Sequence, residues 1–141
     1  MRPDTITYFL KMAVLVSTRS TCVRRSVGCV LTNHRNHVIA TGYNGVAAKL
    51  PHCVNCKRNS RSGEDLDKCM ATHAETNALL QCPDVYSIKT VYVTVSPCIH
   101  CLKLLMNTSA EEIIFLHEYP GSDFCRELWE SANRKWTYVN Q

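Results

Sequence analysis

The chain has 141 residues, 45% of them hydrophobic, and its formal net charge is +4 at pH 7. This length supports one compact domain with its own core and is too short for two ordinary ones, so we predict a single domain over residues 1–141. The charge suits a phosphate-bearing small substrate or a short nucleic acid strand and decides neither. The apolar run at 12–16 is far shorter than the ~20 residues of a membrane-spanning helix, so we expect no membrane span.

The nine cysteines would suggest a disulfide framework in a secreted chain. However, the sequence shows no signal peptide with a basic start, an apolar run and a small-residue cleavage site. We therefore expect a reduced, cytoplasmic protein. Three of the cysteines fall inside predicted strands or helices, where packing in the core is the expected role: Cys29, Cys82 and Cys125.

The first half of the chain predicts one helix, a hairpin and a long loop. Apolar residues recur at helical spacing over 4–19, with Asp4 or Thr5 placed to cap an amphipathic helix that includes Ile6 and Val14 on its apolar side. Two short β-branched runs, 27–31 and 37–41, are separated by polar residues and predict two antiparallel strands. Residues 42–61 are rich in Gly, Asn, Pro and Cys, and with 63–68 they predict a long functional loop.

Helices and strands alternate in the second half. The pattern predicts helices at 73–81, 97–108 and 122–132, the last opened by Ser122 or Asp123, and strands at 90–95, 112–117 and 136–139. A helix, a hairpin and then alternating helices and strands are typical of an α/β fold. We predict a three-layer α/β/α sandwich with a five-stranded mixed sheet.

Two short motifs carry the chemistry. His73-Ala74-Glu75 opens one predicted helix, and Cys98 and Cys101 follow Pro97 at the expected start of another. One imidazole and two thiolates fit the three protein ligands of a catalytic zinc ion, which leaves one position open for water. The sequence therefore predicts Zn²⁺ bound by His73, Cys98 and Cys101.

Glu75 supplies a carboxylate beside this predicted zinc site. It lies two residues from His73, and from the first turn of a helix both side chains can approach the same water molecule. We predict that Glu75 takes a proton from the attacking water, gives it to a ring nitrogen and later protonates the leaving amine. The alternative is that Cys-x-x-Cys forms a structural or redox pair and that His-x-Glu arises by chance.

The motifs, their order and their gap resemble the zinc-dependent cytidine deaminase superfamily, and the deoxycytidylate deaminases within it. The resemblance also covers the basic segment 22–28, the loop Thr41-Gly42-Tyr43-Asn44-Gly45 and the continuation 77–80. It implies a cytidine-deaminase-like fold and hydrolytic deamination of dCMP to dUMP and ammonia, which supplies the precursor for dTTP synthesis. It also implies a homohexamer, with dCTP as activator and dTTP as inhibitor near the same loop.

The resemblance further implies how a nucleotide is held. Asn44 is expected to hydrogen-bond the sugar with help from Thr41, although an ordinary turn would also use glycine and asparagine here. The Ala74 amide and the Ser96 carbonyl are expected to hold the base edge. Tyr119 is our candidate near the phosphate, and Arg24 and Arg25 are cationic candidates that could equally be solvated surface charges.

The remaining cysteines allow a second, structural zinc ion. Cys53-Val54-Asn55-Cys56 lies in the long loop and Cys69 on the far side of its acidic part, while Cys22 stands at a position that some deoxycytidylate deaminases use for such a ligand. Our candidate ligands are Cys22, Cys53, Cys56 and Cys69, with His52 in reserve. Simple buried thiols are the equal alternative.

Two other functions compete with nucleotide deamination. A polynucleotide deaminase, acting on single-stranded DNA or transfer RNA, should show a basic and aromatic track, and aromatic residues are scattered here. A non-enzymatic zinc module would use the same ligands, but it has no need for the unliganded Glu75 carboxylate. We therefore expect no nucleic acid partner and no membrane partner.

Overall fold

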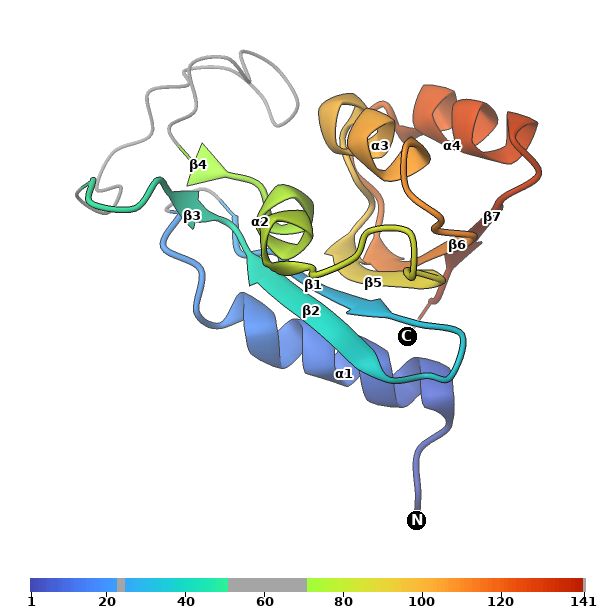
Figure 1. Ribbon diagram of the computed structural model, residues 1–141, viewed down its shortest axis with the longest axis horizontal. Coiled ribbons are helices and arrows are strands. Elements are labelled where there is room, and N and C mark those ends of the chain that lie inside the picture. Colours follow the sequence, from blue (N-terminus) through green and yellow to red (C-terminus); the bar gives the residue numbers. More distant parts are fainter. Residues whose placement is uncertain (23–24, 51–70, 141) are drawn as a thin grey trace.

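The structure is a computed structural model that describes residues 1–22, 25–50 and 71–140. Its centre is a five-stranded mixed sheet in the order β2-β1-β5-β6-β7 (Figure 1), which confirms the predicted fold class. The strands are β1 (Gly28–Thr32), β2 (Val38–Tyr43), β5 (Thr90–Val95), β6 (Glu112–His117) and β7 (Lys135–Tyr138). β1 is antiparallel to both β2 and β5, and the other two pairs are parallel.

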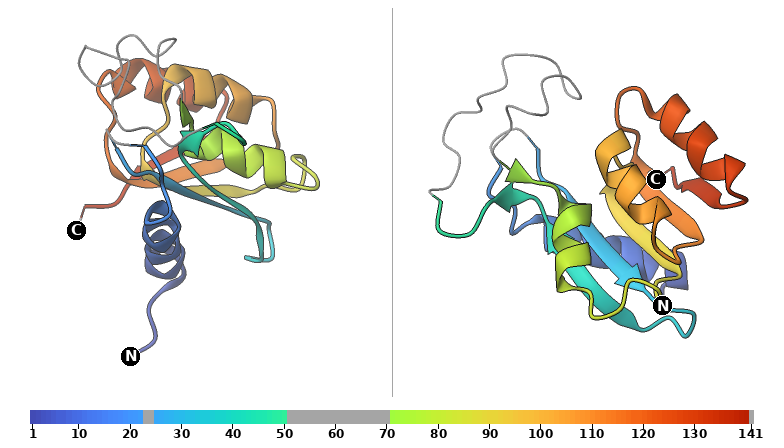
Figure 2. Two further views of the ribbon diagram at one scale, coloured as in Figure 1. Left: turned by 90° about the vertical axis from the view of Figure 1, so that its left-hand side faces the viewer. Right: turned by 45° about the horizontal axis from the view of Figure 1, so that its top comes forward.

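Helices cover the sheet on both faces. Helix α1 (Thr5–Ser17) lies alone on one face, whereas α2 (Ala74–Gln81), α3 (Ile99–Met106) and α4 (Ser122–Ser131) cover the other (Figure 2). The helices on both faces explain why β5 is buried along its whole length. None of the helices in the described part of the chain is long and apolar enough to cross a membrane.

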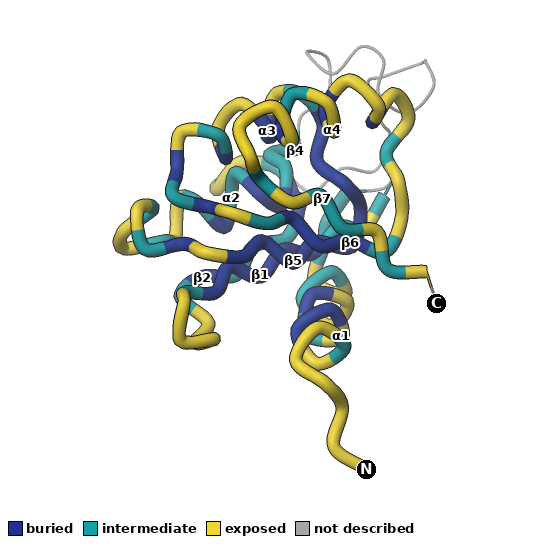
Figure 3. Tube along the Cα trace, turned by 90° about the vertical axis from the view of Figure 1, so that its right-hand side faces the viewer, coloured by how far each residue is buried: buried dark blue, intermediate teal, exposed yellow. Residues whose placement is uncertain are grey.

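Helix α1 is held by a capped start and a narrow apolar stripe. The Asp4 side chain accepts a hydrogen bond from the Thr7 amide at 2.7 Å, as expected for an N-cap residue. Phe9, Leu10 and Ala13 are buried against the sheet. The outer side of α1 is exposed (Figure 3) and carries Ile6 and Val14, which the sequence pattern had wrongly placed inward; a helix on a flat sheet buries only one stripe.

Helix α2 lies in close contact with β2. A methyl group on Gly42 would lie 2.3 Å from the Ala78 nitrogen and 2.4 Å from the Ala74 oxygen, so only glycine allows this approach. Gly42 therefore belongs to a strand that supports α2. The predicted loop starting at residue 42 is wrong for its first residues.

Two helix starts and one pair of strands also differ from the sequence prediction. Helix α3 begins at Ile99 with Cys98 as its N-cap, so Pro97 precedes the helix instead of opening it. Helix α4 starts after Gly121, which has φ 78° and takes the N-cap position, because glycine adopts that backbone without strain. A short pair of strands was missed, β3 (Gly45–Val46) and β4 (Ala71–Thr72), since two residues carry no readable period.

Candidate active site

The starts of α2 and α3 bring three metal-binding side chains together. His73 is the N-cap of α2 and Cys98 the N-cap of α3, and Cys101 lies one turn further along α3. The Nδ1 atom of His73 is 3.4 Å from the sulfur of Cys98 and 3.4 Å from that of Cys101. All three donor atoms lie within 4.8 Å of one another, and both sulfurs are buried.

This donor set fits a zinc ion. A tetrahedral zinc with bonds of about 2.0 Å to nitrogen and 2.3 Å to sulfur separates the two ligand atoms by about 3.5 Å. The observed spacing of 3.4 Å matches without rearrangement. Two soft thiolates with one imidazole also favour zinc over the hard cations that prefer oxygen.

Neither N-cap side chain is used to cap its helix. His73 and Cys98 both have extended backbone angles, and neither makes a side-chain hydrogen bond to its own first turn. Their side chains instead form the cluster with Cys101, and Thr76 Oγ1 lies 3.7 Å from the Cys101 sulfur. The helix starts therefore position the donor atoms at the expense of conventional caps.

Glu75 is buried beside the cluster, with 4% of its surface exposed. Its pKa is raised to about 7, mainly because burial removes solvent and to a lesser degree because of the Cys98 charge, while a hydrogen bond to its own backbone amide and the charge of His73 oppose the shift. A carboxyl group that titrates near neutral pH can both accept and release a proton under physiological conditions.

The two cysteines differ in protonation: Cys101 keeps its proton and Cys98 loses its own. A hydrogen bond from Cys101, helped by one from His73, lowers the pKa of Cys98 to about 4. The pKa of Cys101 is raised, because its proton is held in that bond and the sulfur is buried. Cys98 is thus the thiolate of the metal-free protein, ready to bind a cation.

Two predicted substrate residues, Ser96 and Tyr119, form a second group together with the cationic candidate Arg25. Ser96 is buried two residues before Cys98, and its Oγ accepts a hydrogen bond from the Tyr119 amide at 2.7 Å. The guanidinium carbon of Arg25 lies 5.4 Å from the centre of the Tyr119 ring. Sequence reasoning had left Arg25 undecided between surface and site, and its place over this ring was not readable from local pattern.

The two residues that were expected to hold the sugar, Asn44 and Thr41, lie in different surroundings. Asn44 is buried and its side-chain amide is bonded to the backbone of Arg25 and Val27. Thr41 pairs with Val30, which belongs to the apolar cluster under α1. Because alternate residues of a strand point to opposite faces and Gly42 faces α2, Thr41 faces away from the metal donors. The structure does not bring it to the cluster.

The candidate ligands of a second zinc lie mostly outside the described residues. This applies to Cys53, Cys56, Cys69 and His52, and Arg24 is likewise outside them. Cys22 is described and half-buried. Cys29 and Cys125 are buried in the core as expected, whereas Cys82 is only partly buried.

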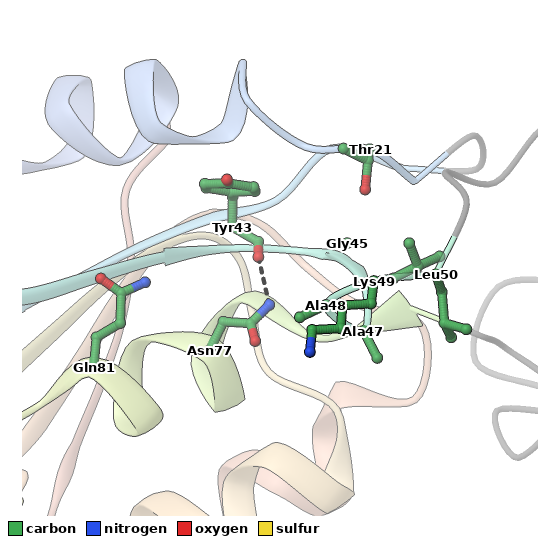
Figure 4. Close-up of a pocket in the computed structure, with 10 residues that line it drawn as sticks. Thr21, Tyr43, Gly45, Ala47, Ala48, Lys49, Leu50, Asn77 and Gln81 are labelled. Atoms are coloured by element: carbon green, nitrogen blue, oxygen red, sulfur yellow. Dashed lines mark hydrogen bonds between the residues drawn. The ribbon is translucent and has the colours of Figure 1, made fainter.

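A separate cavity of about 320 Å³ lies between α2 and the segment that follows β2 (Figure 4). Its walls include Tyr43, Lys49, Asn77 and Gln81. The Asn77 amide donates a hydrogen bond to the Tyr43 carbonyl at 2.8 Å and lies 3.4 Å from that of Thr72. Asn77 was not predicted as a site residue, although its position four residues after His73 places it on the same side of the helix start.

Known proteins of similar sequence identify the family. The family model described as cytidine and deoxycytidylate deaminase zinc-binding region matches residues 3–117. The deoxycytidylate deaminase of Saccharomyces cerevisiae is 39% identical over 124 residues, which are 84% of this chain and 39% of the relative. The deoxycytidylate deaminase of Mycobacterium phage D29 is 37% identical over 126 residues, 83% of this chain and 98% of the relative.

A solved structure shares the fold. The dCMP deaminase of cyanophage S-TIM5, in complex with dCMP and dUMP, matches with a TM-score of 0.78 at 23% identity over 99% of both chains. The chain spans only 39% and 42% of the length of the two yeast relatives. The phage relatives are matched almost from end to end, and the family model covers both halves of the metal cluster. The chain belongs to the zinc-binding family of cytidine and deoxycytidylate deaminases.

Proposed function

We propose that the protein deaminates dCMP to dUMP and ammonia by zinc-dependent hydrolysis. The observation that carries the proposal is the buried Glu75 carboxyl, with a pKa of about 7, beside three donor atoms spaced for zinc. The similarity to deoxycytidylate deaminases supports the choice of a nucleoside monophosphate over a free base.

His73, Cys98 and Cys101 would hold the zinc ion. Zinc in such a site supplies Lewis acidity that makes water a nucleophile near neutral pH. The lowered pKa of Cys98 favours ion binding because that thiol is already deprotonated at neutral pH. The remaining proton, on Cys101, leaves when the ion binds.

Glu75 would handle the protons of the reaction. Its carboxylate takes one proton from the attacking water and passes it to the N3 atom of cytosine as the oxygen adds to C4. It then takes the proton of the hydroxyl now bonded to C4 and transfers it to the exocyclic amine; the C4–N bond breaks, ammonia leaves and the C4 carbonyl of uracil forms. A pKa of about 7 suits both directions of transfer.

The base and the phosphate would be bound by different groups. The Ala74 amide is at the first turn of α2, where N–H groups have no partner within the helix, so it is available to the base edge together with the Ser96 carbonyl. Arg25 would bind the 5′-phosphate, because its Nη1 atom is buried and has no hydrogen-bond acceptor among the described residues. Tyr119 lies beneath the same guanidinium.

The test is ammonia release from cytosine, deoxycytidine, dCMP, dCTP and a single-stranded oligonucleotide. We expect dCMP to be the best substrate, and equal rates with the oligonucleotide would favour the polynucleotide alternative. Glu75→Gln should abolish turnover and retain the zinc content and the circular dichroism spectrum of the wild type. Full activity in Glu75→Gln would exclude the proposed proton transfer, and inactivity of the wild type on every substrate would favour a non-enzymatic zinc module.

We also propose that activity is regulated by dCTP and dTTP in a homohexamer that serves dTTP synthesis. The cavity beside Tyr43 is one place where a regulator could bind, since it lies next to the Thr41–Gly45 segment named by the resemblance. Titration of dCMP turnover with each triphosphate tests regulation: dCTP should activate and dTTP inhibit. Equal curves with and without the triphosphates would disprove it, and light scattering measures the oligomer.

A second, structural zinc ion bound by Cys22, Cys53, Cys56 and Cys69 remains a proposal. Cys22 is half-buried, so its thiol is not part of the sealed core. Elemental analysis of the purified protein should give two zinc ions per chain. One zinc per chain would leave only the His73, Cys98 and Cys101 site.

A further inference from the structure

The side chain of Asn44 ties together two stretches of backbone next to the site. Its Oδ1 accepts a hydrogen bond from the Val27 amide at 2.8 Å, and its Nδ2 donates to the Arg25 carbonyl at 2.6 Å. The Asn44 backbone amide also donates to the Val27 carbonyl at 3.3 Å, and the residue is 6% exposed. Both ends of the side-chain amide therefore serve residues 25 and 27 in this structure.

Arg25 is the residue that these bonds hold in place. Its guanidinium lies over Tyr119, and its Nη1 atom is buried with no hydrogen-bond acceptor among the described residues. A buried cationic donor without an acceptor costs free energy, so other interactions must hold the Arg25 side chain in this position. The hydrogen bonds of Asn44 to the flanking backbone provide them.

We propose that Asn44 is a positioning residue that acts on the nucleotide through Arg25, by fixing the backbone of residues 25–27 so that the guanidinium faces the phosphate. This inference rests on the proposed function, since it takes a 5′-phosphate as the partner of Arg25. It differs from the direct sugar contact that the family resemblance implies for Asn44. The two roles predict different losses when the side chain is removed.

Ligand pairs with and without the phosphate separate the two roles. Calorimetry would measure binding of dUMP and deoxyuridine, which are not turned over, to wild type, Arg25→Gln, Asn44→Ala and the double variant. Arg25→Gln should weaken dUMP binding by roughly ten- to a hundredfold and change deoxyuridine binding by less than about twofold. Asn44→Ala should give a smaller loss for dUMP alone, and the double variant should match Arg25→Gln, because the two changes remove one interaction.

The opposite pattern would overturn the proposal. If Asn44→Ala weakens dUMP and deoxyuridine by the same factor, the side chain contacts the sugar or is merely structural. Additive losses in the double variant would also exclude action through Arg25. Asn107→Ala is the matched control, because that exposed asparagine also donates to a backbone carbonyl, of Lys103 at 2.9 Å, and should leave both affinities unchanged.

A measurement without any nucleotide keeps the test independent of the proposed reaction. The Arg25 Nε–H resonance should be shifted by the Tyr119 ring in wild type and should move toward its solvent-exposed position in Asn44→Ala. An unmoved resonance would refute the positioning role even if dCMP is not the substrate. Should Asn44→Ala fail to fold, Asn44→Asp retains the acceptor for Val27 and lacks the donor to Arg25, so it should show the same shift and the same selective loss of dUMP binding.

Discussion

The two faces of the sheet show how one fold separates stability from chemistry. On one face α1 has a capped start, in which Asp4 bonds the Thr7 amide, and it covers a purely packing surface. On the other face α2 and α3 have His73 and Cys98 at their N-caps, and neither side chain caps its helix. Helices α2 and α3 therefore lack the stabilising side-chain cap that α1 has, and the donor atoms at their two starts meet at one point instead.

Both faces contain buried apolar side chains, so the difference lies in how the helix ends are used. Leu10 of α1 and Leu102 of α3 are each fully buried in their own cluster. Among the described residues, Glu75 on the α2–α3 face is the one carboxyl group that is buried. A packed core that surrounds a carboxyl group raises its pKa, which suits Glu75 to the proton transfer that we propose for it.

The largest expected effect on stability comes from removing a large buried side chain from the apolar cluster on either face of the sheet. Leu10→Ala and Leu102→Ala should each lower the free energy of unfolding by about 2–5 kcal/mol in urea titrations of the metal-free protein. Only Leu102→Ala should weaken zinc binding in a competition with a chelator, because α3 carries Cys98 and Cys101. Equal zinc affinity in both variants would show that the core of the α3 face does not position the donors.

A second comparison uses the two glycines where helices touch the sheet. A methyl group on Gly28 would meet the Ala13 oxygen at 2.0 Å, and one on Gly42 would meet the backbone of α2 at 2.3 Å. We expect Gly28→Ala and Gly42→Ala each to destabilise by about 1–3 kcal/mol, because backbone must move. Only Gly42→Ala, which displaces the helix bearing Glu75, should also reduce zinc affinity and turnover. A loss of zinc affinity in Gly28→Ala would contradict this separation of the faces.

The buried carboxyl group should make stability depend on pH. Burial raises the pKa of Glu75 from 4.5 to about 7, so its protonated form is favoured in the folded state. The stability that this preference gives is complete below about pH 4.5 and is lost as pH rises through about 7. Metal-free wild type should therefore lose stability relative to Glu75→Gln across this window, by at most about 1.4 kcal/mol per pH unit. Parallel curves for the two proteins would show that the carboxyl is not perturbed.

The smallest effect concerns the helix caps. Asp4→Ala should destabilise by about 1 kcal/mol and leave zinc binding unchanged, because it removes the bond to the Thr7 amide. His73→Ser should do the opposite: it abolishes zinc binding and stabilises the metal-free protein by up to about 1 kcal/mol, since serine can cap α2. Thermal unfolding with and without zinc measures both. A His73→Ser variant that is less stable without metal would show that the histidine supports the fold by itself.

Much of the fold was readable from local pattern. The alternation of helices and strands predicted the mixed sheet, and β5 and β6 begin and end where their β-branched runs do. The predicted helix starts were wrong where the chain changes direction, at the start of α3 and at the Gly121 cap of α4. At such positions caps and glycine conformations depend on neighbours from other elements, so local spacing does not decide them.

The site divides in the same way. Four residues stand out in the sequence because their types and spacing are those of three metal ligands with a nearby carboxylate: His73, Glu75, Cys98 and Cys101. The place of Arg25 over the Tyr119 ring could not be read from the sequence, nor could the face of β2 on which Thr41, the expected partner of Asn44 at the sugar, lies, because both depend on how distant segments pair. The same holds for Asn44, whose amide is bonded to residues 17 and 19 positions earlier.

The sequence by itself determined the order of the main elements and pointed to His73, Cys98 and Cys101 as a donor set for zinc with Glu75 beside it, because periodicity and ligand spacing are local properties. The tertiary structure alone decided which helix ends meet, how deeply Glu75 is buried and which face each side chain of β2 occupies. These depend on contacts between residues far apart in the chain, where packing and the loss of solvent set both distances and pKa values.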